Sequence, residues 1–144
     1  EVLGLVADIR EMPGETRTAQ QAADAAGCAL DQIAKSIIFC GEVSGAAILF
    51  LTAGGNQVDA GKASAAAGEA LGKADANLIR AQTGFAIGGV APVGHLTPIT
   101  TFFDARLLDF DVVWGAAGTP RHIFPIDPAV LLPVTGAKQA DFTI

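Results

Sequence analysis

Residues 36–51 read SIIFCGEVSGAAILFL and contain two apolar runs around a polar connection. The runs, 36–40 and 46–51, are as long as typical strands and are rich in branched and aromatic side chains. Gly41 and Gly45 bound the connection between them. Because both runs are too apolar for an exposed surface, we expect them to form a β-hairpin inside the core.

Shorter elements are expected on both sides of this hairpin. Gly54-Gly55-Asn56 is a turn signal, and Gly27 ends an alanine-rich helix because glycine tolerates positive φ. In chain order the predictions are an edge strand over 3–10, a helix over 19–26, a helical turn over 31–34 capped by Asp31, a strand at 57–58, a helix through 67 capped by Asp59, a helix over 74–82, strands over 98–103, 112–114 and 122–126, and a short helix opened by Asp127 and Pro128. This order predicts an α+β fold, with short helices around a small, barrel-like, mostly antiparallel or mixed sheet.

Length and composition limit the class of protein. The 144 residues, 51% of them hydrophobic, suit one domain over 1–144 with a sizeable core and exclude intrinsic disorder. Residues 81–103 carry no charged side chain, but four glycines and two prolines argue against a membrane span. The formal charge of −6 makes a large DNA-binding surface improbable, so any nucleic-acid contact is expected to be small and local.

The two cysteines indicate a reducing compartment. Cys28 and Cys40 lie in apolar surroundings without a CxxC spacing, so we expect two buried thiols. The default expectation is a cytoplasmic protein.

The segment TGFAIGGVAPVGH, residues 83–95, is the most informative candidate for a site. Its glycines at 84, 88, 89 and 94 leave backbone N–H groups that an anion or a carbonyl can approach closely. It matches neither the Walker A loop nor the dinucleotide-binding glycine pattern. Two interpretations stay open from the residues alone: a binding loop, or a bulged strand and turn in which the glycines only permit a bend.

Two further candidates are polar residues beside predicted strands. Lys35 directly precedes the first buried strand, so its ammonium is expected at the sheet edge; the alternative is a solvated lysine that flanks the strand. Residues 118–122 offer a hydroxyl, a guanidinium and an imidazole, or else form an ordinary turn.

Metal and nucleophile chemistry find little support in the sequence. His95 and His122, the only histidines, are too far apart for a local zinc pair, and no cysteine or carboxylate joins them at ligand spacing, so no metal and no cofactor is expected. There is no G-x-S-x-G nucleophile motif. Asp104, Asp109 and Asp111 resemble paired carboxylates, but aspartates beside strands are mostly turn formers.

Four segments in this order resemble one family. They are Thr16-Arg17-Thr18-Ala19 with Ala22-Ala23, Gln32-Ile33-Ala34-Lys35-Ser36, the segment 83–94, and Ala117-Gly118-Thr119. Together they are similar to the YbaK/ProX-type aminoacyl-tRNA deacylases, which also occur as the editing domain associated with prolyl-tRNA synthetase. The strongest element is the G-x-x-x-P loop, here residues 88–92.

The resemblance implies a site and assigns residues to it. Lys35, Gly88 and Gly89 match catalytic positions of the family, and Lys35 would meet the terminal phosphate or carbonyl of the aminoacyl-adenosine. The positions that would line the substrate are Val90, Ala91, Pro92, Gly94, His95, Gly118, Thr119 and His122. Arg121 and Asp104 follow as weaker matches.

The resemblance also implies an activity: an ester hydrolase that proofreads mischarged tRNA in trans and protects the fidelity of translation. Its partners would be the acceptor end of a tRNA carrying a small amino acid and an aminoacyl-tRNA synthetase, without membrane or DNA. The acceptor end would be held by a few bases among Lys35, Arg17, Lys62, Lys73 and Arg80. The alternative is a non-catalytic module that binds an aminoacyl-like ligand or a synthetase.

Overall fold

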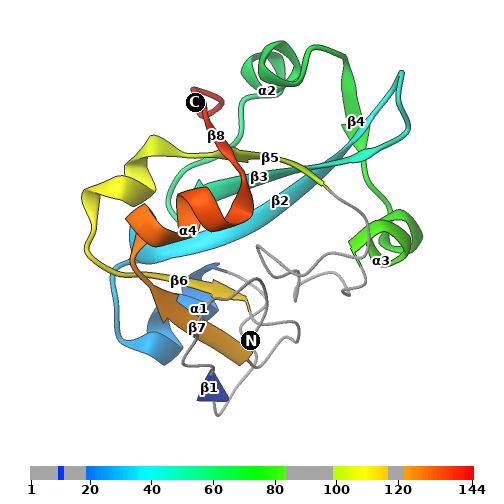
Figure 1. The fold of residues 1–144 in the computed structure, drawn as a ribbon. Coiled ribbons are helices and arrows are strands. Elements are labelled where there is room, and N and C mark those ends of the chain that lie inside the picture. The colour runs from blue at the N-terminus through cyan, green and yellow to red at the C-terminus, as the bar shows by residue number, and fades with distance from the viewer. Residues whose placement is uncertain (1–9, 12–18, 84–98, 117–121) are drawn as a thin grey trace.

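The structure of the protein, a computed structural model, describes residues 10–11, 19–83, 99–116 and 122–144 (Figure 1). The strands are β1 (Arg10–Glu11), β2 (Ile33–Gly41), β3 (Ala47–Ala53), β4 (Leu71–Lys73), β5 (Thr100–Phe103), β6 (Val113–Ala116), β7 (His122–Ile126) and β8 (Lys138–Gln139). The α-helices are α1 (Ala19–Ala26), α2 (Ala60–Ala67), α3 (Ala76–Thr83) and α4 (Pro128–Thr135), and two 3₁₀ turns are η1 (Leu30–Gln32) and η2 (Ala105–Asp109).

All described strands belong to one mixed sheet in the order β1-β7-β6-β2-β3-β5-β8, with β4 pairing with the far end of β2. The long hairpin of β2 and β3 is antiparallel, with Lys35 opposite Thr52 and Cys40 opposite Ala47. The β2–β6, β3–β5 and β5–β8 pairs are parallel. The expected α+β fold with a mixed sheet is confirmed, and its centre is the predicted hairpin.

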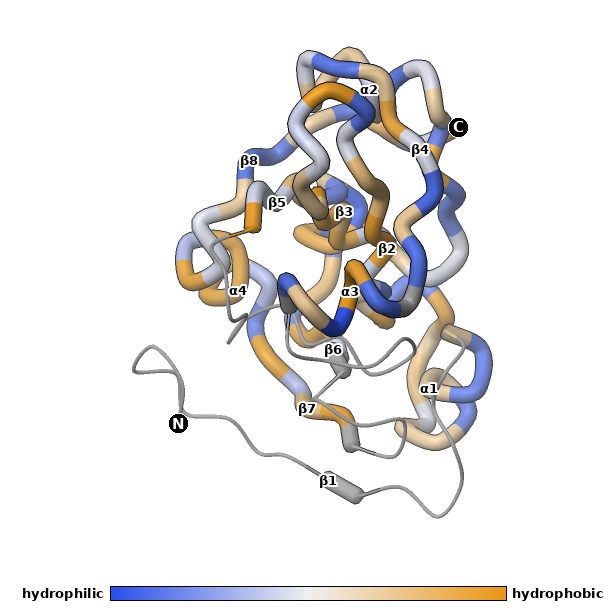
Figure 2. Tube along the Cα trace, turned by 90° about the vertical axis from the view of Figure 1, so that its right-hand side faces the viewer, coloured by the Kyte–Doolittle hydropathy of each residue, from blue (hydrophilic) through white to orange (hydrophobic). Residues whose placement is uncertain are grey.

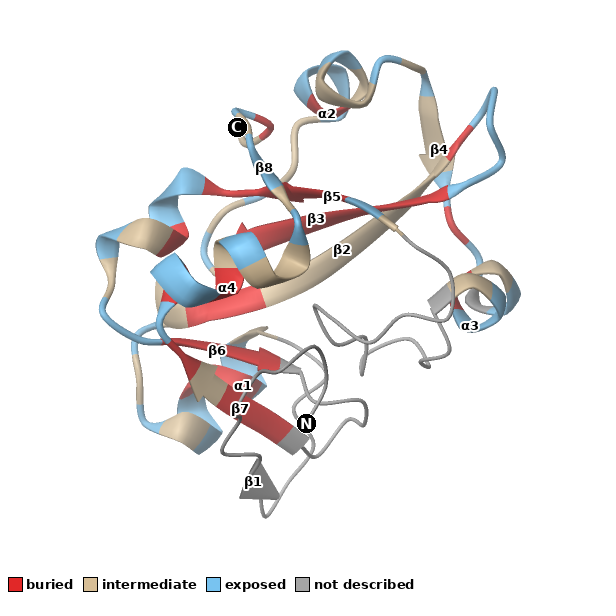
Figure 3. Cartoon of the chain, viewed as in Figure 1, coloured by how far each residue is buried: buried red, intermediate tan, exposed pale blue. Residues whose placement is uncertain are grey.

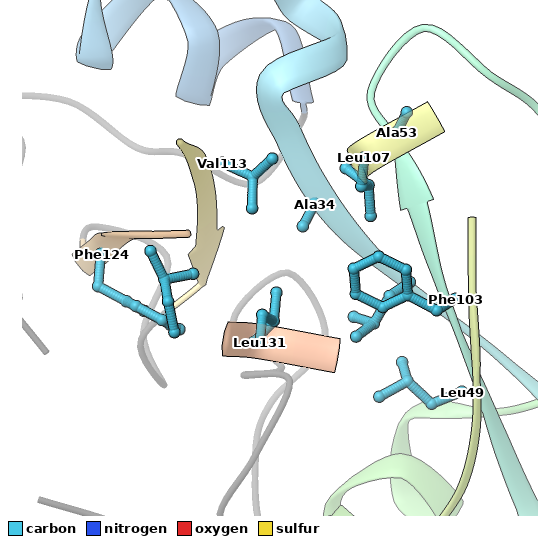
Figure 4. Packing of buried hydrophobic residues seen from close by; sticks show 10 residues of the cluster. Ala34, Leu49, Ala53, Phe103, Leu107, Val113, Phe124 and Leu131 are labelled. Atoms are coloured by element: carbon cyan, nitrogen blue, oxygen red, sulfur yellow. The ribbon is translucent and has the colours of Figure 1, made fainter. Parts of the chain in front are cut away.

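Strand β3 is buried on both faces, which explains its uninterrupted apolar sequence. Leu49 and Leu51 point into the main core cluster, together with Phe103, Leu107 and Leu131 (Figure 4). The alternate residues Ile48 and Phe50 enter a second cluster with Phe102, Phe142 and Ala63 of α2. Figure 3 shows β3 as a buried strand in the middle of the sheet. A strand placed in this way anchors both layers of the domain.

A third cluster lies under α1. Ala22 and Ala23 of this helix pack against Ile33, Trp114 and Ile123 of three neighbouring strands. Figure 2 shows the apolar residues concentrated along β2 and β3. Among the helices in the described parts of the chain, none has the length and apolar composition needed to cross a bilayer.

Two helices begin and end as their sequences predict. The side chain of Asp59 accepts a hydrogen bond from the Lys62 amide at the start of α2, and Gly68 ends that helix at φ 79°. Asp127 caps α4 in the same way, with Pro128 in its first turn.

Replacing the Asp59 cap with alanine is expected to lower the free energy of unfolding by about 1 kcal/mol, because one helix amide loses its acceptor. Chemical denaturation of the variant measures this loss. Asp111→Ala is the matched control, since it removes the same charge from an exposed residue without a capping contact. Equal losses in the two variants would contradict the capping role.

The other local predictions have mixed outcomes. The helix over 19–26 and the strand over 122–126 are confirmed, and Gly27 has the expected positive φ of 71°. The strand at 57–58 is wrong, because Val58 makes only an isolated bridge to Thr143. The predicted helical turn is present as η1, but its bounds and cap are wrong: it spans Leu30–Gln32 with Ala29 and not Asp31 as its cap, and β2 already begins at Ile33. Residues 3–9 of the predicted edge strand lie outside the described residues.

Candidate functional site

Lys35 is the third residue of β2, so it lies within the strand and not before it, as the sequence suggested. β2 pairs with β3 along its length and with β6 through Ile33 and Ala34, and Lys35 itself is paired only with Thr52 of β3. Strand alternation puts its side chain on the same face as Ile33 and Ile37. Ile33 belongs to the cluster under α1 and Ile37 to the cluster under α2, so Lys35 lies between these two clusters.

The ammonium of Lys35 is held by the turn that follows β3. Its Nζ donates to the backbone carbonyl oxygen of Gly54 at 3.2 Å and to the backbone carbonyl oxygen of Asn56 at 2.5 Å. An ammonium has three N–H donors, and these two carbonyls use two of them. Within the described residues no other acceptor binds Nζ.

The turn itself is fixed by Asp104, which is 5% exposed. Oδ2 of Asp104 accepts from the Ala53 amide at 3.1 Å and from the side-chain amide of Asn56 at 2.9 Å, and Oδ1 accepts from the Arg106 amide at 3.0 Å. The backbone amide of Asn56 in turn donates to the Ala53 carbonyl. Asp104 therefore joins the end of β3, the turn and the start of η2.

Asp31 supports the turn from the opposite side. Its Oδ1 accepts from the Gly55 amide at 2.8 Å, and its Oδ2 accepts from Arg106 Nε at 3.1 Å. The turn lies so close to η1 that a Cβ on Gly54 would overlap with the Leu30 carbonyl oxygen, and one on Gly55 with the Asp31 carboxylate. Glycine is required at 54, where the neighbour is backbone, whereas a side chain at 55 would displace the Asp31 carboxylate from the turn.

The surroundings of Lys35 act on its pKa in opposite directions. Burial lowers the pKa below the ordinary lysine value because the charged form loses solvation, while the negative charges of Asp104 and Asp31 raise it and offset part of that effect. Lys35 is half-buried and both carboxylates lie nearby, so the site carries a partly desolvated cation beside two anions.

Most of the other predicted site residues lie outside the described residues. These are Gly88, Gly89, Val90, Ala91, Pro92, Gly94, His95, Gly118 and Thr119, together with Arg17 and Arg121. His122 begins β7, where its backbone is paired with that of Glu11. The expected meeting of Lys35 with the glycine segment therefore stays a prediction.

The remaining predicted cations differ in their contacts. Lys62 is bound to the C-terminal segment through Asp141 at 3.4 Å and the Thr143 carbonyl at 3.0 Å. Lys73 and Arg80 are exposed and make no ion pair with any described residue. These two residues place two exposed positive charges on β4 and α3.

The cysteines are free and half-buried, less buried than expected. Burial raises the pKa of the Cys28 thiol, which disfavours the thiolate. In the described ranges no group of three or more potential metal ligands comes together.

Sequence reasoning missed the residues that surround Lys35. Asn56 was identified only as part of a turn, Asp31 as a helix cap and Asp104 mainly as a turn former. They lie 21, 4 and 69 positions from Lys35, so no local pattern connects them. Asp104 does act as the cap of η2, through its bond to the Arg106 amide, but its buried carboxylate is also an acceptor for the turn.

Comparison with known proteins gives a consistent result. Residues 13–133 match the family model described as the aminoacyl-tRNA editing domain. A protein of Bacillus subtilis (strain 168), "Uncharacterized protein YwhH", is 32% identical over 124 residues, which cover 86% of this chain and 78% of that protein.

Two solved structures share the fold over nearly the whole chain. One, described as "Crystal structure of a putative trans-editing enzyme for prolyl tRNA synthetase", has a TM-score of 0.89 and 46% identity, and the match covers 96% of this chain and 87% of that one. The other, "hypothetical protein APE2540", has a TM-score of 0.89 and 28% identity, with coverages of 99% and 94%.

Proposed function

The chain belongs to the aminoacyl-tRNA editing-domain family, and on that premise we propose that it hydrolyses the ester between a small, wrongly attached amino acid and the end of a tRNA. The similarity to a structure described as a trans-editing enzyme supports action on a separate tRNA complex. The observation that carries the proposal is the ammonium of Lys35, which is half-buried and bound by two backbone carbonyls, and whose third N–H has no acceptor among the described residues.

The proposed reaction needs no strong nucleophile from the protein, because an ester is already activated. A water oxygen adds to the ester carbonyl carbon, and the carbonyl oxygen becomes an oxyanion. The bond to the ribose oxygen then breaks, the ribose oxygen takes a proton, and the free amino acid leaves. A hydroxyl or amine of the substrate itself helps to activate the water.

In this proposal Lys35 orients the substrate and neutralises its developing negative charge. The backbone amides of Gly88 and Gly89 act as further oxyanion donors, and Val90, Ala91, Pro92, Gly94, His95, Gly118, Thr119 and His122 line the acyl pocket, as the family resemblance implies. Donors fixed before the reaction stabilise an oxyanion more than water does, because they need no reorganisation. The rigid turn that holds Lys35 meets this requirement.

Binding of the tRNA is proposed to be local. Lys73 and Arg80, both exposed and without an ion-pair partner in the described part of the chain, contact phosphates of the acceptor end. With a net charge of −6, the protein binds the tRNA weakly or shares it with a synthetase.

A panel of tRNAs charged with alanine, serine, threonine or cysteine tests this proposal. We expect purified protein at micromolar concentration to release at least one of these amino acids well above the uncatalysed rate. The release is measured with labelled amino acid, and the same tRNA carrying its cognate amino acid is the control.

Failure to release any amino acid of the panel would contradict the deacylase function. A rise in melting temperature with a non-hydrolysable aminoacyl-adenosine analogue, in the absence of turnover, would instead establish the alternative of a non-catalytic binding module.

A further inference from the structure

We propose that Asn56 is a positioning residue, which holds the Lys35 ammonium and keeps it apart from the Asp104 carboxylate. This inference rests on the proposed function, because it assigns a role to Asn56 in the same site. Asn56 is the one described residue that bonds to both groups: its backbone carbonyl accepts from Lys35 Nζ at 2.5 Å, and its side-chain amide donates to Asp104 at 2.9 Å and so fixes that carbonyl in place.

The first step of the argument concerns the carboxylate. Asp104 is 5% exposed, and its oxygens already accept from two backbone amides and from Asn56. Lys35 and Asp104, both described, form no direct ion pair. The Asn56 amide occupies one of the positions on Asp104 Oδ2 that a lysine could otherwise bind.

The second step concerns what this separation achieves. A direct ion pair would commit a donor of the ammonium to Asp104 and reduce its attraction for a substrate oxyanion. With Asn56 between them, the charge of Asp104 still favours the protonated lysine, while one Nζ donor stays available. The arrangement combines a stable positive charge with a free donor.

The third step concerns rigidity. A lysine side chain has four rotatable bonds, so its ammonium occupies one position only when other groups hold it. The Asn56 side chain ties the turn to Asp104, and Asp31 ties Gly55 to η1 and to Arg106. Asn56 is half-buried and the other asparagine of the chain, Asn77, is exposed on α3, which makes Asn77 a matched control.

Nuclear magnetic resonance of the lysine ammonium groups tests the proposal without any tRNA. The chain has four lysines, at 35, 62, 73 and 138, so the Lys35 signal is assigned by its loss in Lys35→Ala. We expect Asn56→Ala to raise the pKa of Lys35 toward its ordinary value, because the loosened ammonium gains hydration. Asp104→Asn removes a nearby negative charge and should lower that pKa further.

Opposite shifts of the Lys35 pKa in Asn56→Ala and Asp104→Asn distinguish positioning from a general loss of structure. A loss of structure would shift the Lys35 pKa in the same direction in both variants. Asn77→Ala should leave the Lys35 signal unchanged. Shifts of equal sign, or a Lys35 signal in Asn56→Ala that matches the Asn77→Ala control, would overturn the proposal.

Kinetics provide the second measurement. Asn56→Ala is expected to lower kcat about tenfold with little change in KM. This factor lies within the range of interaction energies measured between residues in contact. In a Lys35→Ala background the same substitution should have almost no effect on the single-turnover rate. Equal factors in both backgrounds would show that Asn56 acts independently of Lys35 and overturn the proposal.

The pH profile gives a third measurement. The Lys35-dependent part of the rate, wild type minus Lys35→Ala, should fall as the pH rises through the depressed pKa of Lys35. In Asp104→Asn this fall should occur at lower pH; the substitution keeps one acceptor oxygen for the Ala53 and Asn56 amides, gives up the acceptor for the Arg106 amide, and leaves the contacts of Asp31 with Gly55 and Arg106 in place. If the wild type hydrolyses no charged tRNA while the resonance shifts follow the expectation, the deacylase function fails and the positioning role of Asn56 stands.

Discussion

Replacing Lys35 with alanine is expected to lower the single-turnover rate of deacylation by about 100- to 1,000-fold, the effect of removing one well-placed oxyanion donor. Among the described residues, only the Lys35 ammonium is bound by two backbone carbonyls, those of Gly54 and Asn56. The rate is measured with the member of the charged-tRNA panel that the wild type hydrolyses fastest, at saturating enzyme.

Two further variants make this result specific. Lys35→Met keeps most of the aliphatic stem and removes the charge, so it should lose activity to a similar extent. Lys138→Ala removes a lysine from an exposed position in β8 and should retain full activity. The melting temperature of each variant establishes that it is folded. Full activity in a folded Lys35→Met variant would remove Lys35 from the mechanism.

Replacing Phe50 with alanine is expected to lower the free energy of unfolding by about 3 to 5 kcal/mol, a large share of the roughly 5 to 15 kcal/mol typical of a domain. Phe50 is 0% exposed, and its ring contacts three others. The ring centroids of Phe39, Phe102 and Phe142 lie 5.7, 5.3 and 4.9 Å away. Alanine would leave a cavity between β2, β5 and the C-terminal segment.

Urea denaturation measures this loss. Phe50→Leu refills part of the volume and should cost less than the alanine variant. Phe110→Ala is the matched control at the margin of the core, where the ring is half-buried and stacks under Arg106 at 4.7 Å. Similar losses at positions 50 and 110 would contradict the central role of Phe50 in joining the layers.

The elements that could be predicted are those with a strong local pattern. The hairpin of β2 and β3, α1, and the caps of α2 and α4 all follow from apolar runs or capping residues in the sequence. The start of β2 could not be predicted, because Ile33 and Ala34 are extended by their parallel pairing with Trp114 and Gly115. A tertiary contact decided this boundary.

Two strands, β4 and β8, were not predicted. They have three and two residues, too few for any alternation, and they are strands only because β2 and β5 supply their hydrogen-bond partners. The helix predicted over 74–82 begins later, at Ala76, since the Asp75 side chain accepts from the Leu78 amide at 2.7 Å and caps it.

The site could be predicted in part. Lys35 was identified from its place beside the buried strand and from the family resemblance, but Asp31, Asn56 and Asp104 each have a local role that hides their shared one. Polar residues that cap a helix or form a turn do not reveal by spacing which distant cation lies near them. Such networks become visible only when the strands are in register.

Residues on either side of the segment 84–98 are both attached to the beginning of β3. Gln82, near the end of α3, accepts from the Ala47 amide at 2.8 Å and donates to the Gly45 carbonyl at 3.2 Å. Thr100, at the start of β5, is paired with Ile48. The two anchor points are thus neighbours at the beginning of β3.

This attachment has an evolutionary consequence. Because both anchors lie at the same end of β3, evolutionary changes in the length of the stretch between them alter the entropy of closing it only slowly.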